Sequence, residues 1–259
     1  MEIKKSLLVG LLKFLGNLSK IVLVFSFLFA AFSCNKENPI SNNNIVGTVT
    51  DADGNTYQTV KIGNQVWMAE NLRTTKYNDG TPITLDTSTA TWNSGIAGKY
   101  CYYNNTANAD SIRKNGALYN WFAVNTGKLA PAGWHVPSDA EWNILLNYLI
   151  ANGYNWDGTK DSNKVAKSLA AKTDWTDVDR QGDPGNDQSN NNKSGFSAFP
   201  SGDRYFGYFE KMGRTPNWWS ETEDNSLAIS WGLDFDQDLF QGGQGDKNTG
   251  FSVRLLKDN

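Results

Sequence analysis

The sequence predicts an α+β domain in which strands early and late in the chain enclose two main helices. Short alternating runs separated by turn residues open and close the chain, and an apolar stripe with helical spacing lies between them. The composition, with ten Trp, ten Tyr and 24 Gly but only seven Pro, suits small twisted sheets and long structured loops fastened by aromatic side chains. We expect the first and last strands to pair in one antiparallel sheet.

The opening strands are expected within residues 46–71. Residues 57–62 and 65–69 alternate between polar and apolar side chains, and an earlier alternating run ends at Thr50. Asp-Gly separates the first two runs, and Gly-Asn separates the next two. Such dipeptides between alternating runs are typical of consecutive β-hairpins. The sequence therefore predicts that the domain begins with a small antiparallel meander.

The best-defined helix is expected just after Ser138. Ser138 can cap this helix, and Glu141, three residues later, can close a capping box. Gly153 should end the helix. Between these ends the apolar residues recur at helical spacing: Trp142, Leu145, Leu146, Leu149 and Ile150. Weaker helical spacing predicts shorter helices within residues 117–124 and 164–172.

The second half of the chain is expected to hold a long loop followed by strands. The loop covers residues 177–194, which have no apolar position beyond Val178. Alternating or apolar runs then predict strands at residues 196–199, 204–209, 218–220, 227–235 and 251–256.

The first 33 residues are typical of a bacterial lipoprotein signal. Lysines precede an apolar run from Ile21 to Phe32, and small residues lead to Cys34. Cleavage before Cys34 would expose its sulfur for acylation, so we expect an N-terminal lipid that anchors the protein to a membrane. The apolar run is about half of the ~20 residues that a spanning helix needs. Secretion with cleavage elsewhere stays open. Residues 34–45 are expected to form a flexible tether, and residues 46–259 the folded domain.

Charge and cysteine content exclude several classes of partner and reaction. Without residues 1–33, 20 of the 24 basic and 26 of the 27 acidic residues remain, so the net charge is −6. No basic cluster follows Lys36, which argues against nucleic acid as a partner. If Cys34 carries lipid, Cys101 is the one thiol left and no intramolecular disulfide can form. Cys101 lies in an alternating run, and we expect it to be buried and unreactive.

Several motifs, in this order, resemble the Fibrobacter succinogenes major paralogous domain. They are DGNTY at residues 53–57, IGNQVWMAENL at 62–72, YNW at 119–121, GWHVPSDAEW at 133–142, GFSA at 195–198, WWS at 218–220 and GFSVR at 250–254. The resemblance covers residues 46–257. That family is common in lipoproteins and surface proteins of Gram-negative bacteria. It implies an outer-membrane lipoprotein on the surface or periplasmic face of the cell envelope.

Some of the same motifs are also similar to the C-type-lectin-like fold of sulfatase-modifying factors. The similarity implies small twisted antiparallel sheets, two main helices and long structured loops. Formylglycine-generating oxidation in that related family depends on a pair of cysteines near the C-terminal end, and no cysteine follows Cys101. We therefore do not expect this oxidation, and no other catalytic constellation is recognisable.

The segment after residue 217 is the strongest candidate for ligand binding. Trp218 and Trp219 should point to opposite faces of a strand, so that one anchors the core and the other can stack on a sugar ring. The alternative is that both rings are buried for structural reasons. If the strand continues, the acceptors Glu221, Glu223 and Asn225 lie on one side of it.

The long loop and His135 are two further candidate sites. Carboxylates in the long loop could hold calcium, although their spacing fits no defined coordination pattern and a solvated loop is the alternative; they are Asp177, Asp179, Asp183 and Asp187. His135 is the one histidine, and we expect it to be structural and bonded to a backbone carbonyl. No other metal or cofactor is expected.

The sequence thus predicts a lipid-anchored envelope module for binding or adhesion, whose ligand is a glycan or a surface protein. The rival interpretation is a glycan hydrolase that uses acids around Glu221 and Glu223 or within the long loop. A third is a structural subunit of a surface assembly. A binder should present exposed aromatic side chains on a shallow patch, whereas an enzyme should present a concave pocket with carboxylates of perturbed pKa.

Overall fold

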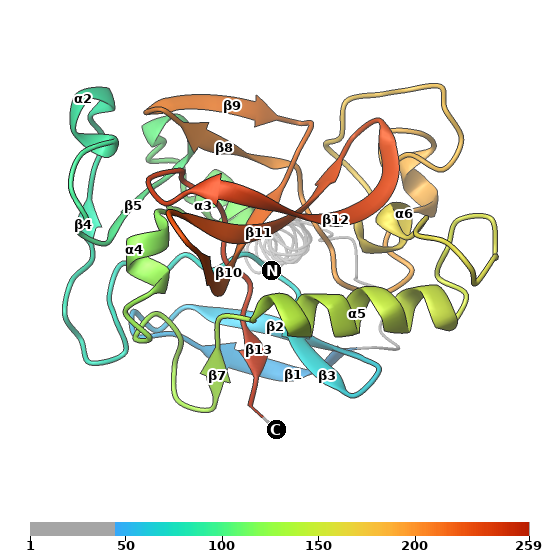
Figure 1. The fold of residues 1–259 in the computed structure, drawn as a ribbon, viewed down its shortest axis with the longest axis horizontal. Helices are drawn as coiled ribbons and strands as arrows, with labels where there is room; N and C mark the ends of the chain where they lie inside the picture. The colour runs from blue at the N-terminus through green and yellow to red at the C-terminus, as the bar shows by residue number, and fades with distance from the viewer. Residues whose placement is uncertain (1–44, 259) are drawn as a thin grey trace, which may run out of the picture. The chain divides into compact units, whose positions relative to one another are not determined.

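The computed structural model describes residues 45–258 (Figure 1). The predicted signal, the Cys34 anchor and nearly all of the predicted tether lie outside these residues. The first strand begins at Ile45, one residue before the expected start of the domain. Small antiparallel and mixed sheets are combined with short helices, which confirms the α+β class.

The predicted meander and its closing strand form a five-stranded sheet of order β1-β2-β3-β13-β7. Its strands are β1 (Ile45–Thr50), β2 (Thr56–Ile62), β3 (Gln65–Met68), β7 (Trp134–His135) and β13 (Leu256–Lys257). Asp51 holds the first turn by accepting the backbone N–H groups of Asp53 and Asn55, both at 2.9 Å. Leu256 pairs with Trp67 in antiparallel register. The early and late strands therefore share one antiparallel sheet, as expected.

A second sheet has the order β10-β11-β12 and is antiparallel. Its strands are β10 (Asn217–Asp224), β11 (Leu227–Asp234) and β12 (Gln237–Asp246). The first two contain predicted strands, whereas β12 was not predicted because its sequence, QDLFQGGQGD, is poor in strand-forming residues. Close packing explains two of its three glycines: a Cβ would lie 2.6 Å from the ring of Trp219 at Gly245 and 3.1 Å from the ring of Trp231 at Gly242.

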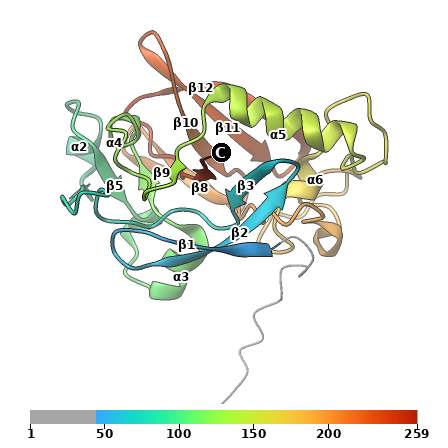
Figure 2. The ribbon, with the colours of Figure 1, turned by 90° about the horizontal axis from the view of Figure 1, so that it is seen from below.

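Helix α5 (Asp139–Ala151) is the longest helix in the described part of the chain and has the predicted capping box between Ser138 and Glu141. Gly153, just beyond its end, has a φ of +74°, which suits a helix stop. Trp142, Leu145 and Leu149 are buried, while Leu146 and Ile150 are half-buried. Figures 1 and 2 show α5 running beside both the β10–β12 sheet and strands β2 and β3.

The predictions of the two shorter helices and of several later strands are only partly right. Residues 117–124 split into β6 (Leu118–Tyr119) and a single turn, α4 (Trp121–Val124), and residues 164–172 hold only the turn α6 (Ala166–Leu169). Residues 204–209 are not one strand but the turn of a hairpin between β8 (Ser201–Tyr205) and β9 (Tyr208–Met212). Residues 196–199 and 251–255 make isolated bridges at Ala198, Phe251 and Ser252. Side chains are buried there without a continuous ladder of backbone hydrogen bonds. The apolar pattern alone could not distinguish such a buried segment from a paired strand.

The remaining elements lie within residues 84–190. They are β4 (Thr84–Leu85), α2 (Thr89–Trp92), β5 (Lys99–Cys101), the 3-10 turn Tyr103–Asn105, α3 (Ala109–Asn115) and the 3-10 turn Gln188–Asn190. Strands β4, β5 and β6 form a small sheet. Cys101 in β5 is buried, which confirms the burial predicted for it. Burial raises the pKa of its thiol to about 12, which disfavours the reactive thiolate.

Candidate functional site

Trp218 and Trp219 point to opposite faces of β10, as predicted, but both rings are fully buried. Trp218 packs in an aromatic cluster with Trp67, Trp142, Trp231, Phe196 and Phe240. Trp219 packs against Phe251 on the other side, with ring centroids 4.6 Å apart. Each indole N–H also has a buried acceptor, Asn71 Oδ1 for Trp218 and the Tyr119 carbonyl for Trp219. The interpretation of either ring as a sugar-stacking surface is therefore wrong.

The predicted acceptors beside these rings are exposed, but β10 ends at Asp224 and Asn225 lies in the turn beyond it, with a φ of +55°. Glu221, Glu223 and Asn225 are all exposed. Glu223 is engaged in an ion pair with Lys247, whose ammonium lies 5.0 Å from the ring centroid of Trp121. Because both Trp rings are buried, β10 exposes no aromatic face of these rings beside the acceptors.

The four aspartates of the long loop do not converge on one point. Asp183 is buried and accepts two hydrogen bonds from Nε of Arg180 and one from its Nη2. Asp177 accepts from Gln188, and Asp187 from Ser189 and Asn190. Within residues 45–258, no three His, Cys, Asp or Glu side chains are gathered as a metal site would require. The calcium hypothesis for Asp177, Asp179, Asp183 and Asp187 is wrong, because the four carboxylates are not gathered and those of Asp177, Asp183 and Asp187 bond to their own loop.

His135 is structural, but its partners are carboxylates and not a backbone carbonyl. Its Nδ1 lies 2.6 Å from Asp258 and its Nε2 lies 2.9 Å from Glu141. Burial lowers the pKa of His135, yet the hydrogen bonds with Asp258 and Glu141 outweigh burial and raise it. Since Glu141 also closes the capping box of α5, His135 ties the C-terminal strand to the start of that helix.

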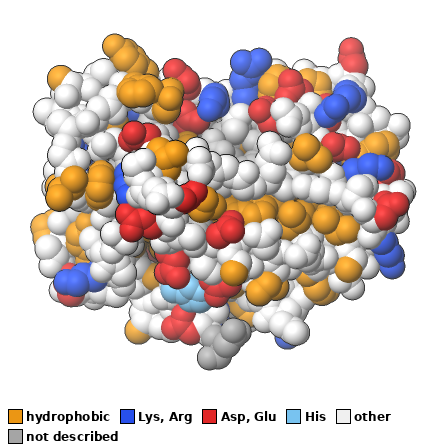
Figure 3. Space-filling model, viewed as in Figure 1, with side chains coloured by type: hydrophobic (Ala, Val, Ile, Leu, Met, Phe, Trp, Pro, Cys, Tyr) orange, Lys and Arg blue, Asp and Glu red, His pale blue; other side chains and the backbone are white. Residues whose placement is uncertain are grey.

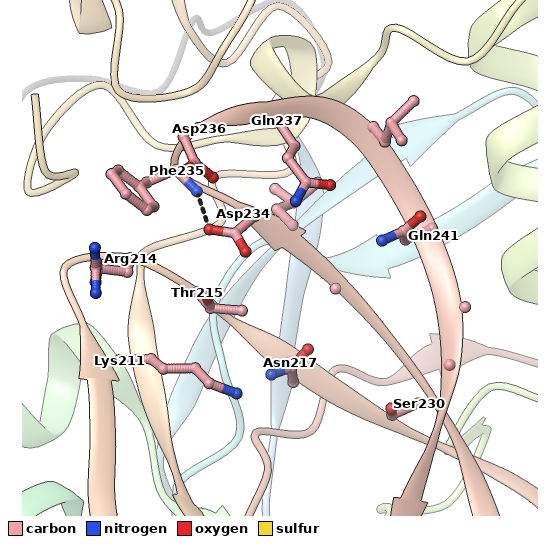
Figure 4. A pocket seen from close by; sticks show the side chains of 15 residues that line it. Lys211, Arg214, Thr215, Asn217, Ser230, Asp234, Phe235, Asp236, Gln237 and Gln241 are labelled. Atoms are coloured by element: carbon pink, nitrogen blue, oxygen red, sulfur yellow. Dashed lines mark hydrogen bonds between the residues drawn. The ribbon is translucent and has the colours of Figure 1, made fainter. Parts of the chain in front are cut away.

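A pocket of about 470 Å³ lies on the face of the β10–β12 sheet that is turned away from the Trp218 cluster (Figure 4). Strand alternation accounts for most of this arrangement, because Trp231 of β11 packs in the core cluster while Ser230, Gly232 and Asp234 line the pocket. Leu233 belongs to the core cluster and also borders the pocket. Figure 4 shows β12 curving around the pocket, with Gln237 and Gln241 on the curve. The ladder between β11 and β12 is irregular between Gly232 and Asp234, which is where a bulge bends a strand.

The wall opposite β12 is held by a buried carboxylate. Oδ2 of Asp203 accepts from Lys211 Nζ at 3.0 Å and from Asn217 Nδ2 at 3.3 Å. Burial raises the pKa of the Asp203 carboxyl, while Lys211 opposes this rise. A Cβ at Gly232 would lie 2.2 Å from Oδ1 of Asn217, so only glycine leaves room for this amide. The polar side chains of Lys211 and Asn217 are therefore fixed in place on the pocket wall.

The pocket also contains an aromatic face and a carboxyl with a raised pKa. The guanidinium of Arg214 lies 4.6 Å from the ring centroid of Phe235. Burial, together with the negative charge of Asp236, raises the pKa of the Asp234 carboxyl. The pocket thus combines cationic, acidic, amide and hydroxyl groups within one small volume, and a bound molecule would need many hydrogen-bonding groups to match them.

The turn between β8 and β9 presents aromatic side chains to solvent. Tyr205, Phe206 and Tyr208 are 43%, 57% and 65% exposed. Phe206 has a φ of +47° and Gly207 a φ of +83°, the pattern of a turn that favours Asn-Gly. The left-handed conformation costs an ordinary side chain about 1–2 kcal/mol. Figure 3 shows hydrophobic side chains gathered at the upper left, over this turn and α2.

The comparison with family models decides the membership of the chain. The model described as Fibrobacter succinogenes major domain matches residues 60–257. The chain belongs to this family. The match begins inside β2, so β1 and the first turn of the meander precede the matched part of the Fibrobacter succinogenes major domain. No curated protein and no solved structure gave a match.

The family motifs of this Fibrobacter succinogenes major domain are mostly parts of its core. The late WWS motif places its two rings in the core on opposite sides of β10, and the GFSVR motif supplies the buried Arg254. The C-type-lectin-like arrangement stays a prediction. Within residues 45–258, no helix has the length and apolar character needed to cross a bilayer.

The pocket was missed from the sequence because its lining residues come from β9, β10, β11, β12 and the loops between them, within residues 211–243, and show no motif. Only the Gly242-Gly243 pair and the polar alternation of Ser230, Gly232 and Asp234 hinted at an open, polar sheet face. These signals indicate a pocket only if the pairing of β12 with β11 is known, and β12 was not predicted.

Proposed function

We propose that this protein is a binding module of the Gram-negative cell envelope, anchored by lipid on Cys34, and that its polar pocket binds a glycan. The observation that carries the proposal is the lining of the pocket. Sugar hydroxyls both donate and accept hydrogen bonds, and the pocket offers amides, two hydroxyls, carboxyls and cations for them. The Phe235 ring adds an apolar surface beside these groups. Family membership and the N-terminal sequence support the envelope location.

Binding should depend on the two glutamines of β12 that line the pocket, Gln237 and Gln241. In a Gln237→Ala/Gln241→Ala variant, we expect glycan affinity to fall about 30-fold, since each lost hydrogen bond contributes about 1 kcal/mol. The full chain, purified in detergent, would be applied to a glycan array and the hits followed by calorimetry. Gln244→Ala is the matched control, because Gln244 is exposed on the same strand but bonds to Asp224 outside the pocket. Equal losses in the control and the double variant, or no glycan bound by the wild type, would contradict the proposal.

The anchor has its own test. Cys34→Ala should move the protein from the membrane fraction to the soluble fraction, because without acyl chains the apolar contact with the bilayer is lost. Cys101→Ala is the control: this cysteine is buried, and its replacement should leave the protein in the membrane fraction. Incorporation of labelled fatty acid should likewise depend on Cys34 alone. Full membrane retention of Cys34→Ala would refute lipidation at this residue.

A glycan hydrolase is the second candidate, and the raised pKa of Asp234 beside Asp236 favours it. Glycosidases pair a protonated carboxyl with an ionised one. In this hydrolase hypothesis the candidate catalytic acids are those of the pocket, Asp234 and Asp236. They replace the acids suggested by the sequence, which were Glu221, Glu223 and the loop aspartates. Release of reducing sugar from an array hit, abolished by Asp234→Asn, would support hydrolysis. Binding without turnover would leave the module a binder.

A further inference from the structure

The aromatic turn between β8 and β9 serves no evident purpose in folding. Phe206 takes a left-handed conformation that Asn or Gly would adopt more easily, and its ring remains more than half exposed. It therefore gains little from burial to offset its unfavourable backbone. Exposed residues in strained conformations occur preferentially at functional sites.

The turn is also held in place by the buried side chain of Arg204 and by packing against α2. The side chain of Arg204 is buried and donates from Nε to the Gly207 carbonyl at 3.1 Å and from Nη1 to the Asp86 carbonyl at 2.6 Å. Its guanidinium lies 4.3 Å from the ring centroid of Trp92. A Cβ at Gly207 would lie 2.7 Å from the Thr89 carbonyl oxygen, so the turn sits directly on α2. A surface held in this way loses little conformational entropy on binding.

Strand β9 connects this turn to the polar pocket. Tyr208 is its first residue, and Lys211, three residues later, lines the pocket. Three residues of strand span about 10 Å. Figure 1 shows β9 running from the turn toward the region where β10 begins. A ligand that contacts both places must be extended, and a monosaccharide is too short.

We propose that the turn formed by Tyr205, Phe206, Gly207 and Tyr208 is a stacking platform for the sugar rings of a polysaccharide whose chain also enters the pocket. This inference rests on the proposed function and narrows its ligand to a polymer. Three partly exposed rings offer much less than the roughly 800 Å² that each side of a stable protein interface buries. The turn also lacks the exposed Lys and Arg that favour contact with anionic lipids. A flat ring face, in contrast, suits the apolar face of a sugar ring.

The test compares polymer binding with stability. In Phe206→Asn, polysaccharide affinity should fall about fivefold, as expected for one lost ring contact. The melting temperature should stay equal or rise, because Asn suits the left-handed position. A purely structural role predicts no loss of binding. The full chain in detergent would be titrated with particles of cellulose, xylan, chitin and peptidoglycan. Ile144→Asn, which changes another exposed apolar residue on α5, is the matched control and should bind normally.

A second variant of the turn and a binding experiment with lipid vesicles complete the test. Tyr208→Ser should weaken binding to the same polymer, while disaccharides that occupy only the pocket should bind Phe206→Asn and wild type equally. Unchanged polymer affinity in both turn variants, together with lost affinity in Gln237→Ala/Gln241→Ala, would overturn the platform and leave the proposed function standing. Absence of binding to every glycan would overturn both. Turn-dependent binding to phosphatidylglycerol vesicles without polysaccharide binding would overturn the platform in favour of a lipid surface.

Discussion

Replacing Arg254 by alanine is expected to lower the free energy of unfolding by about 4 kcal/mol. Its guanidinium is buried and donates to Asn71 Oδ1 at 2.9 Å and to the carbonyls of Met68, Phe196 and Ser197. Truncation would leave these buried acceptors without donors and open a cavity beside the Phe196 ring, whose centroid lies 4.3 Å from the guanidinium. Urea unfolding followed by tryptophan fluorescence would measure the loss.

The chemistry of Arg254 makes this prediction specific. Burial lowers the pKa of Arg254 to about 9, yet the side chain remains charged at neutral pH. One ammonium cannot reach carbonyls on separate segments, so Arg254→Lys should also be strongly destabilised. Arg113→Ala is the control: Arg113 is exposed, its ion pair with Asp110 spans 4.0 Å, and its loss should cost less than about 0.5 kcal/mol. Near-wild-type stability of Arg254→Lys would show that the network is not needed.

Truncation of Trp218 to alanine is expected to cost about 4 kcal/mol, as for other large buried aromatic residues. The ring lies 5.5 Å from Phe196 and 6.1 Å from Trp142, centroid to centroid, and its N–H donates to Asn71 Oδ1 at 2.9 Å. Far-UV circular dichroism during urea unfolding is the suitable measurement, because the variant lacks one fluorophore. Tyr208→Ala, which removes an exposed ring, should change stability by less than about 0.5 kcal/mol. An unchanged unfolding midpoint for Trp218→Ala would refute the packing described for β10.

The two predictions are coupled through Asn71. Its Oδ1 accepts from both Trp218 and Arg254, so the double variant should be less destabilised than the sum of the two single variants. The same packing has a functional consequence. Loss of ligand binding in Trp218→Ala or Trp219→Ala would report damage to the fold, whereas the pocket glutamines and the aromatic turn can be changed without disturbing the core.

Local signals account for what could be predicted of the fold. The meander follows from turn dipeptides between alternating runs, and α5 follows from a capping box and an apolar stripe, all of which act over fewer than about 15 residues. The opposite faces of Trp218 and Trp219 follow from strand alternation. Local pattern could not decide the length of the 117–124 and 164–172 helices, because buried single turns and strands show the same short apolar spacing.

The sequence by itself determined the α+β class, the meander, the long capped helix and the family of the chain, because each depends on residues close together along the chain or on recognisable motifs. Only the tertiary structure decided that both rings of the WWS motif are buried, that a glycine-rich segment forms β12, and that polar residues of β9, β10, β11 and β12 meet in one pocket. Burial and strand pairing depend on residues far apart in sequence. Trp219 and Gly245, for example, pack together only because β11 lies between their strands and sets their register.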